Sequence, residues 1–319
     1  MGMNISTKQA YGKALLSLGS QNIKIIVLDA DLAKATCTLE FGETFPDRFF
    51  NMGIAEQDLF ATAAGLSTCG LIPFATTFAM FSAGRAYDQI RNSIAYPNLN
   101  VKIVGVHGGI STGPDGASHQ CIEDFSLMRT IPNMVVVSPT DPLETAKAVY
   151  AIAKYEGPVY LRLTRDPMPN ITREDKDFII GKADRLFDGK DLTIFATGVM
   201  VHKALKVREL LNLEGISARI VNVHTIKPID TEEILLAASE TNKIVTLEDH
   251  NIIGGLGSAV SEVVTDNYPV PILRIGVNDV FGQSGTSDDL FEYYGLGTDC
   301  ITESIKEFLI KKAVLNKKN

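Results

Sequence analysis

Short, continuously apolar runs rich in Val and Ile alternate along this chain with longer amphipathic segments. Runs that are apolar at nearly every position are typical of parallel strands covered on both faces of a sheet. The strands predicted in this way are Ile23–Leu28, Val101–Val106, Met134–Val137, Val159–Leu163, Leu192–Ala196, Ala218–Val223, Lys243–Leu247 and Ile272–Ile275. The pattern therefore predicts the α/β class with parallel or mostly parallel sheets.

Segments with a helical spacing of apolar residues lie between these runs. The clearest one begins at Asp141, which can cap the helix, continues with Pro142 and Glu144 in the first turn, and runs to Tyr155. Further helices are predicted at Thr7–Ser20, Ala55–Ser67, Ala83–Ile94, Val201–Leu213, Thr231–Ser239 and Glu303–Lys311.

The alternation of strands and helices lapses between Arg165 and Asp191, where a Pro-rich stretch precedes residues of mixed charge. A lapse of this kind is typical of an interdomain linker. We therefore expect the 319 residues to form a first domain over 1–170, a linker over 171–190 and a second domain over 191–319.

Composition and charge exclude several classes of protein. Hydrophobic residues make up 45% and charged residues 21% of the chain, which is typical of a globular protein and not of a disordered or collagenous one. The net charge of -8 argues against binding to nucleic acid or to an anionic membrane. No apolar run approaches the length of a transmembrane helix. Any phosphate group that this protein binds must meet a local cluster of basic side chains.

The four cysteines lie far apart and without metal-ligand spacing, so we expect reduced thiols, no metal site within this chain and a cytoplasmic protein. The amino terminus lacks the pattern of a signal peptide. Met1-Gly2 with Ser6 formally fits a myristoylation motif, but we interpret the first two residues as a cloning remnant ahead of Met3.

A Gly-rich segment, His107–Gln120, directly follows a predicted strand. Ligands of open parallel sheets bind beyond the carboxyl ends of the strands. The histidines of this segment and Asp115 suit hydrogen bonding to polyhydroxyl substrates and proton transfer near neutral pH, although a long structural loop is the alternative. A second Gly-rich segment, Gly254–Gly257, lacks phosphate-binding spacing and is better explained as a tight entry into a helix.

Two further signals are weak when each is taken alone. Glu56 lies at the start of a predicted helix, where an acidic residue usually just offsets the helix dipole. Phe78 and Phe81 are three positions apart, which more often indicates core packing than a ring-stacking surface.

The order of these segments along the chain resembles the transketolase family. The matching segments are Asp29–Leu32, Gly53–Gln57, Thr77–Phe81, Gly113–Gln120, Ile131–Asn133, Ser138–Asp141, His224–Asp230, Leu247–His250 and Gly254–Gly257. The resemblance implies a pyrimidine-binding domain of the thiamine-diphosphate fold followed by a transketolase C-terminal-like α/β domain. It also implies the cofactor thiamine diphosphate and the transfer of a two-carbon ketol unit between sugar phosphates, as in the pentose phosphate pathway.

One part of the family's pattern is missing from this chain. A complete transketolase begins with a diphosphate-binding domain that carries Gly-Asp-Gly and a later Asn for Mg²⁺ and the diphosphate, and no Gly-Asp-Gly occurs here. The chain therefore resembles the C-terminal subunit of a split transketolase. A separate N-terminal subunit would hold Mg²⁺ and the diphosphate, and we expect the two kinds of chain to form a heterotetramer. The chain alone could form a homodimer and should be inactive.

The resemblance assigns cofactor contacts to four residues. Glu56 faces N1′ of the aminopyrimidine and is catalytic, because a carboxyl that shares a proton with N1′ favours the imino tautomer whose 4′-nitrogen removes the C2 proton of the thiazolium. Phe81, with Phe78 behind it, is the surface on which the pyrimidine stacks. Asp31 matches an acidic position near the cofactor at the subunit interface.

Substrate contacts follow in the same way. His119, the second expected catalytic residue, and Asp115 match residues that bind substrate hydroxyls near the reacting carbon. His107 and Arg165 match residues that hold the sugar phosphate through charge-assisted hydrogen bonds. Lys8 stands where the family has an arginine and would be a weaker phosphate contact.

Some positions depart from the family and leave alternatives open. Ala35 replaces a phosphate-binding serine and Gly84 replaces an aromatic residue, so the identity of the sugar is open. The segment Gly84–Gln89 resembles deoxyxylulose-phosphate synthase, and the architecture and length also fit the beta subunit of a 2-oxo acid dehydrogenase. The loop 115–119 and the spacing of the two phenylalanines favour transketolase. The joint presence of Glu56, Phe81, Asp115 and His119 argues against a non-catalytic regulatory relic of the fold.

Overall fold

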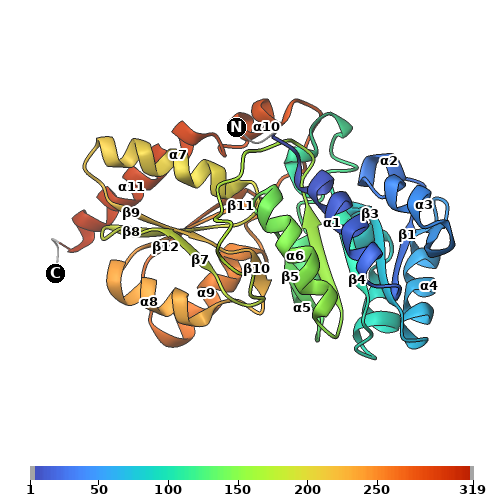
Figure 1. Ribbon diagram of the computed structural model, residues 1–319. Helices are drawn as coiled ribbons and strands as arrows, with labels where there is room; N and C mark the ends of the chain where they lie inside the picture. The colour runs from blue at the N-terminus through green and yellow to red at the C-terminus, as the bar shows by residue number, and fades with distance from the viewer. Residues whose placement is uncertain (1–3, 317–319) are drawn as a thin grey trace.

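The computed structural model describes residues 4–316, with side chains up to residue 310. The first three residues, on which the interpretation of a cloning remnant falls, lie outside the described residues. Two α/β units lie next to each other, each with a sheet between helices (Figure 1). The expected fold class is thereby confirmed.

The first sheet has seven strands in the order β10-β5-β6-β4-β3-β1-β2. All neighbouring pairs are parallel except β10 with β5. Every residue of β1, β4 and β6 is buried, as continuously apolar strands predict. The strands are β1 Ile25–Asp29, β2 Phe49–Asn51, β3 Ile72–Phe78, β4 Lys102–Val106, β5 Val135–Val137, β6 Val159–Leu163 and β10 Thr225–Lys227.

Helices cover both faces of this sheet. One face packs against α1 and α6 around Tyr11, Leu15 and Ile152, and the other packs against α4 and α5 around Phe60 and Phe125. The helices are α1 Thr7–Gln21, α2 Ala33–Thr36, α3 Leu39–Thr44, α4 Glu56–Thr68, α5 Asp124–Thr130 and α6 Pro142–Lys154. The expected cap of α6 is present, because the Asp141 carboxylate accepts the backbone N–H of Glu144 at 2.7 Å.

The segment predicted as one helix over Ala83–Ile94 has a different form. Two π-helices, η2 (Phe81–Arg85) and η3 (Gln89–Ala95), flank a turn at Ala86 and two α-helical residues, 87 and 88. Gly84 within the segment weakens a regular α-helix, and π-helical turns occur frequently at functional sites. The wider turns follow directly after the carboxyl end of β3.

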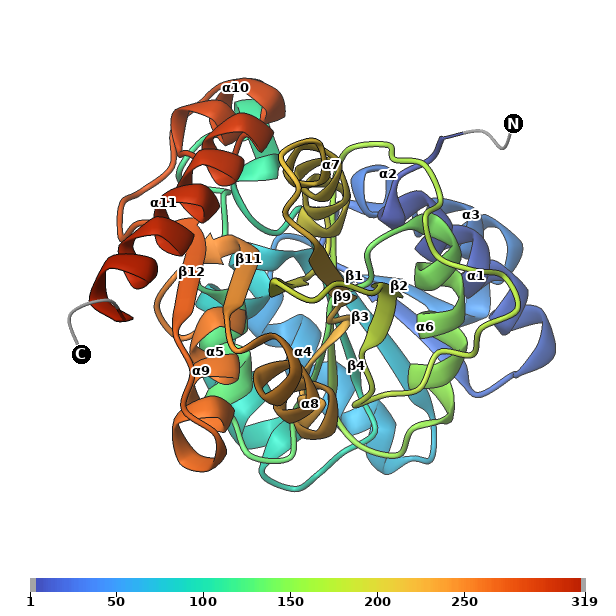
Figure 2. The same ribbon diagram turned by 90° about the vertical axis from the view of Figure 1, so that its left-hand side faces the viewer.

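The second sheet has five strands in the order β12-β11-β8-β9-β7, parallel except for β7 at one edge. Figures 1 and 2 show α7 and α11 on one face and α8 and α9 on the other. The strands are β7 Asp184–Phe187, β8 Leu192–Ala196, β9 Ala218–Asn222, β11 Ile244–Asn251 and β12 Ile272–Val277. The helices are α7 Met200–Leu213, α8 Thr231–Thr241, α9 Leu256–Asn267, α10 Ser287–Tyr293 and α11 Thr298–Asn316.

The two units are joined by more than one connection. Strand β10, from the second half of the chain, pairs with β5 of the first sheet, and one continuous apolar cluster runs from Phe60 and Phe125 to Phe195 and Val260. The segment expected to be a linker contributes β7 to the second sheet. The domains therefore share a core and hold a fixed relation to each other.

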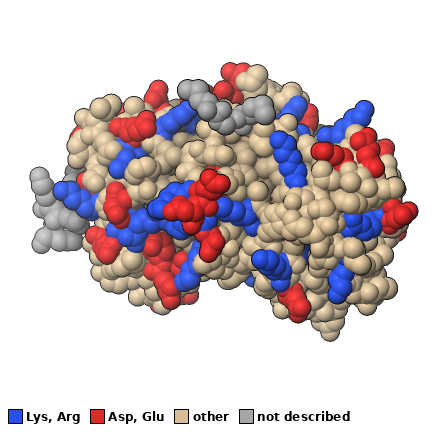
Figure 3. Space-filling view, in the orientation of Figure 1, with Lys and Arg blue, Asp and Glu red and all other residues tan. Residues whose placement is uncertain are grey.

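The described helices include none that is long and apolar enough to cross a membrane. Basic and acidic side chains are interspersed on the face that Figure 3 shows.

Candidate functional site

The predicted site residues gather at one edge of the first sheet. Asp31 follows β1, Phe81 follows β3, His107 follows β4 and Arg165 follows β6. Because these strands are parallel, their carboxyl ends lie at the same edge, where open α/β sheets bind ligands.

Glu56 is the first residue of α4, and its side chain is only 2% exposed. Its Oε2 atom accepts a hydrogen bond from Nη1 of Arg85 at 3.1 Å. The Arg85 guanidinium in turn lies over the Phe81 ring, with its carbon 4.6 Å from the ring centroid. The buried carboxylate therefore lies beside an aromatic face, which is the arrangement that a flat, nitrogen-containing ring would need.

Four aromatic rings form a cluster next to this pair. Phe78 stacks on Phe81 with 6.1 Å between centroids and on His107 with 4.6 Å between centroids. The His119 ring meets Phe81 edge-on at 5.2 Å. The cluster brings the predicted cofactor surface into contact with two predicted substrate residues, although these residues come from separate segments of the chain.

His107 is buried and neutral. Burial and the nearby cations Lys8 and Arg165 lower its pKa to about 3. Its Nε2 atom lies 3.1 Å from Nζ of Lys8, so the ammonium group donates to Nε2 and the ring proton resides on Nδ1. Among the described residues Nδ1 has no hydrogen-bond partner, although it is buried. This N–H is therefore a buried donor in need of an acceptor.

The backbone at His107 supports a functional interpretation of this residue. Its φ of 60° lies in the left-handed region, which costs free energy for a residue with a side chain. The Thr112 hydroxyl, which donates to the His107 carbonyl at 2.6 Å, helps to hold the strained turn.

Arg165 and Asp115 form the next contact along the edge. Nη1 of Arg165 donates to the Thr112 carbonyl at 2.7 Å and lies 3.3 Å from Oδ1 of Asp115. The other carboxylate oxygen of Asp115 is 4.0 Å from Nδ1 of His107. Both side chains of this ion pair are about one-third exposed, so a ligand can reach them.

A cavity of about 590 Å³ lies beside Arg165, between the two domains. Lys203 and Lys206 of α7 line its far wall, together with the acidic residues Asp166 and Asp288. Three cations around this cavity provide the local basic cluster that an acidic protein needs for an anionic ligand.

Asp31 lies apart from the aromatic cluster. Its side chain is exposed, its φ is 62°, and Oδ1 accepts a hydrogen bond from the Asn51 amide at 2.9 Å. The structure thus places Asp31 on the rim of the site, next to the edge strand β2.

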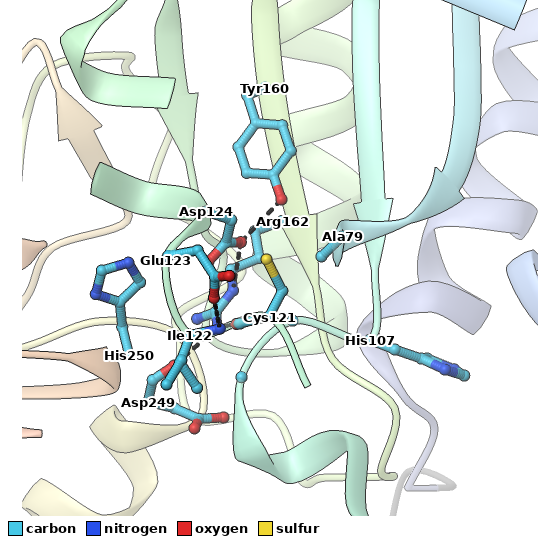
Figure 4. A network of polar contacts seen from close by, with 12 residues as sticks. Ala79, His107, Cys121, Ile122, Glu123, Asp124, Tyr160, Arg162, Asp249 and His250 are labelled. Atoms are coloured by element: carbon cyan, nitrogen blue, oxygen red, sulfur yellow. Dashed lines mark hydrogen bonds and ion pairs between the residues drawn. The ribbon is translucent and has the colours of Figure 1, made fainter. Parts of the chain in front are cut away.

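The sequence did not indicate a buried polar network that supports the loop His107–Gln120 (Figure 4). Nε of Arg162 pairs with Asp124 at 2.9 Å, and Nη2 donates to the Asp249 carbonyl at 2.7 Å. The Asp249 carboxylate accepts the hydroxyl of Ser111 at 2.6 Å and the backbone N–H of Ile110 at 2.9 Å. Residues of the second domain therefore hold the beginning of the predicted substrate loop.

Gly109 shows how closely Asp249 approaches this loop. Its φ is 82°, and a Cβ atom at this position would lie 2.1 Å from Oδ2 of Asp249. Only glycine fits this approach, so Gly109 is required by the packing against Asp249 as well as by its backbone conformation.

The chain matches two family models, "Transketolase, pyrimidine binding domain" over residues 3–170 and "Transketolase, C-terminal domain" over residues 181–301. It is 50% identical to a chain of Methanocaldococcus jannaschii that carries the provisional name of a transketolase C-terminal section, with 98% of each chain covered. A solved split-gene transketolase, in an inactive beta4 tetramer, is also 50% identical, with a TM-score of 0.88 over 97% of this chain and 99% of that one.

Single-chain relatives are longer. The transketolase of Homo sapiens is 36% identical over 98% of this chain, and the match covers 50% of the human protein. The chain thus spans about half the length of such relatives and nearly all of the two split ones.

Proposed function

The chain belongs to the transketolase family, and we propose that it is the C-terminal subunit of a split, thiamine-diphosphate-dependent transketolase. Together with a separate diphosphate-binding subunit it transfers a two-carbon ketol unit between sugar phosphates, as in the pentose phosphate pathway. The domain bounds that we propose are 1–170 and 191–319, with the connecting segment 171–190, whose strand β7 joins the second sheet.

The observation that carries this proposal is the buried Glu56 carboxylate beside the face of Phe81. These two groups fit an aminopyrimidine, because the carboxylate can share a proton with N1′ while the ring stacks on the phenylalanine. When bound, thiamine diphosphate would supply a nucleophilic carbon for addition to the carbonyl of the donor sugar. We assign Mg²⁺ and the diphosphate to the partner subunit, because this chain covers nearly the whole length of two split relatives.

The remaining residues of the edge are assigned to the substrate. His119 lies against Phe81, so it can hydrogen-bond and exchange protons with hydroxyls near the reacting carbon. Asp115 positions a further hydroxyl. Arg165, Lys8 and the N–H of His107 together hold the distal phosphate, for which two cations and a neutral donor are suited.

Exposed apolar side chains beside Glu56 support a partner subunit at this surface. Phe50, at the edge strand, is 42% exposed and Ile54, just before α4, is 78% exposed. Exposed apolar groups next to a site indicate an interaction surface, and a chain that covers them would also close the cofactor site. The four unpaired cysteines fit a reducing compartment, for which we propose the cytoplasm.

Assembly with the diphosphate-binding chain tests this proposal. Sedimentation of the mixed chains should give a heterotetramer, and Ile54→Asp should prevent it by placing a charge in the interface. Ile23→Asp is the matched control, because Ile23 is 82% exposed at the amino-terminal edge of the sheet. Assembly that survives Ile54→Asp, or that fails equally with both variants, would contradict an interface beside Glu56.

A further inference from the structure

Arg85 makes both of the contacts that the proposed cofactor ring would need. Its Nη1 atom donates to Oε2 of Glu56 at 3.1 Å, and its guanidinium carbon lies 4.6 Å from the centroid of the Phe81 ring. Within the described residues, no other hydrogen bond or ion pair reaches the Glu56 carboxylate. Arg85 was not among the residues that the sequence pointed to.

A guanidinium group resembles an aminopyrimidine in the features that matter here. Both are flat, both present N–H donors in the plane of the group, and both stack on the face of an aromatic ring. If the aminopyrimidine takes the Oε2 atom and the ring face that Arg85 now covers, the two groups cannot bind there together.

We propose that Arg85 competes with the aminopyrimidine of the cofactor for Glu56 and Phe81, and that it must turn away before the ring enters. This inference rests on the proposed function, since it takes these two residues as the pyrimidine site. It adds a residue that controls cofactor binding from within the site.

The surroundings of Arg85 permit such a movement. Its side chain is 49% exposed and lies at the end of η2, just before the turn at Ala86. Turning toward solvent therefore requires no change in the core. Glu56 is buried and fixed at the start of α4, and it cannot follow.

The exchange of Arg85 for the cofactor ring also indicates what Arg85 does before the cofactor binds. A buried carboxylate without a partner is costly, so Glu56 needs a cation until the ring arrives. Arg85 supplies this cation, and the ring can replace it only with a proton, taken up from solvent, that N1′ shares with the carboxylate. Flat compounds without a nitrogen at the N1′ position would be rejected, because they would leave the carboxylate unpaired.

Titration calorimetry of thiamine diphosphate with Mg²⁺ into the two-chain complex tests the proposal. Arg85→Ala and Arg85→Gln should each lower the Kd by about three- to tenfold, the range expected when a half-exposed ion pair no longer has to be broken. In a Glu56→Ala background, Arg85→Ala should lower the Kd by clearly less, because only the contact of Arg85 with Phe81 remains to be broken. Arg91→Ala is the control, because the exposed Arg91 lies in η3 and, among the described residues, its side chain bonds only to the neighbouring Asn92.

The possible outcomes separate this inference from the proposed function. If the complex binds the cofactor but Arg85→Ala leaves the Kd unchanged or raises it, Arg85 supports Glu56 instead of competing, and the inference is wrong. An equal gain in affinity with and without Glu56 would also overturn it. If the wild-type complex binds no thiamine diphosphate, both the inference and the pyrimidine site are wrong.

Discussion

Asp249 of the second domain accepts a 2.6 Å hydrogen bond from the hydroxyl of Ser111 in the loop of the first domain. The same carboxylate accepts the backbone N–H of Ile110 at 2.9 Å. The loop continues to Asp115 and His119, so the second domain fixes the segment that carries two proposed substrate residues. The second domain is therefore part of the proposed site.

Asp249→Asn is expected to lower the free energy of unfolding by about 1–3 kcal/mol, because the amide turns an N–H₂ group toward buried donors that need an acceptor. Chemical denaturation measures this change. Asp188→Asn is the matched control, since Asp188 is 83% exposed and should change stability little. Equal stability of the two variants would show that the hydrogen bonds of Asp249 do not hold the loop.

Glu56→Gln should lower turnover of the assembled enzyme by on the order of 10² or more at saturating cofactor, because the amide cannot share a proton with N1′. Folding should be intact, since the change is nearly isosteric. Asp58→Asn, two positions further along the first turn of α4 and exposed, should leave turnover unchanged. A loss of only a few-fold in Glu56→Gln would mean that Glu56 merely starts the helix.

Arg165→Ala should mainly raise KM for phosphorylated sugars, because a contact made equally in the ground and transition states changes binding more than turnover. Losing a charge-assisted hydrogen bond costs about 1.5–3 kcal/mol, or roughly ten- to more than a hundredfold in affinity. Hydroxypyruvate, a donor without phosphate, is the control in steady-state kinetics. Equal losses for both donors would show that Arg165 instead holds the loop through Thr112 and Asp115, which it contacts.

Acid should destabilise the fold through His107. Its pKa is lowered to about 3 in the folded chain, whereas histidine in an unfolded chain titrates near 6.5. As the pH falls below about 6.5, the unfolded chain gains a proton that the folded chain does not bind, so stability falls by up to about 1.4 kcal/mol per pH unit.

His107→Gln removes this titration and is the variant to compare. Unfolding curves at pH 7 and pH 4.5 should show that the wild-type chain loses more stability than the variant. Glu144 and Glu248, whose pKa values burial raises to about 8 and about 7, titrate in both proteins and cancel. Parallel losses would contradict a neutral, buried His107.

The strands that the sequence predicted are those whose environment is uniform. β6 and β8 have the predicted bounds, because each is buried along its whole length and its apolar run ends with the strand. β7 begins with Asp184 and Arg185 at a sheet edge, and the three residues of β10 pair with the other domain. Their local sequences contain no signal of these pairings.

The site residues, too, divide into those that the local sequence indicates and those that it does not. Residues that follow parallel strands could be expected to meet, since the sheet brings the strand ends together. Arg85 reaches Glu56 across 29 positions, and Asp249 reaches Ser111 across 138. Both lie in segments that resemble known motifs, but their partners depend on side-chain packing that no spacing pattern records.

The most direct test of the split-subunit proposal is the rate of ketol transfer by the chain with and without its partner. Xylulose 5-phosphate and ribose 5-phosphate serve as substrates, with thiamine diphosphate and Mg²⁺ present. The chain alone should show no turnover, and addition of the diphosphate-binding chain should produce it. Turnover by the chain alone, or none after a heterotetramer has formed, would contradict the proposed function.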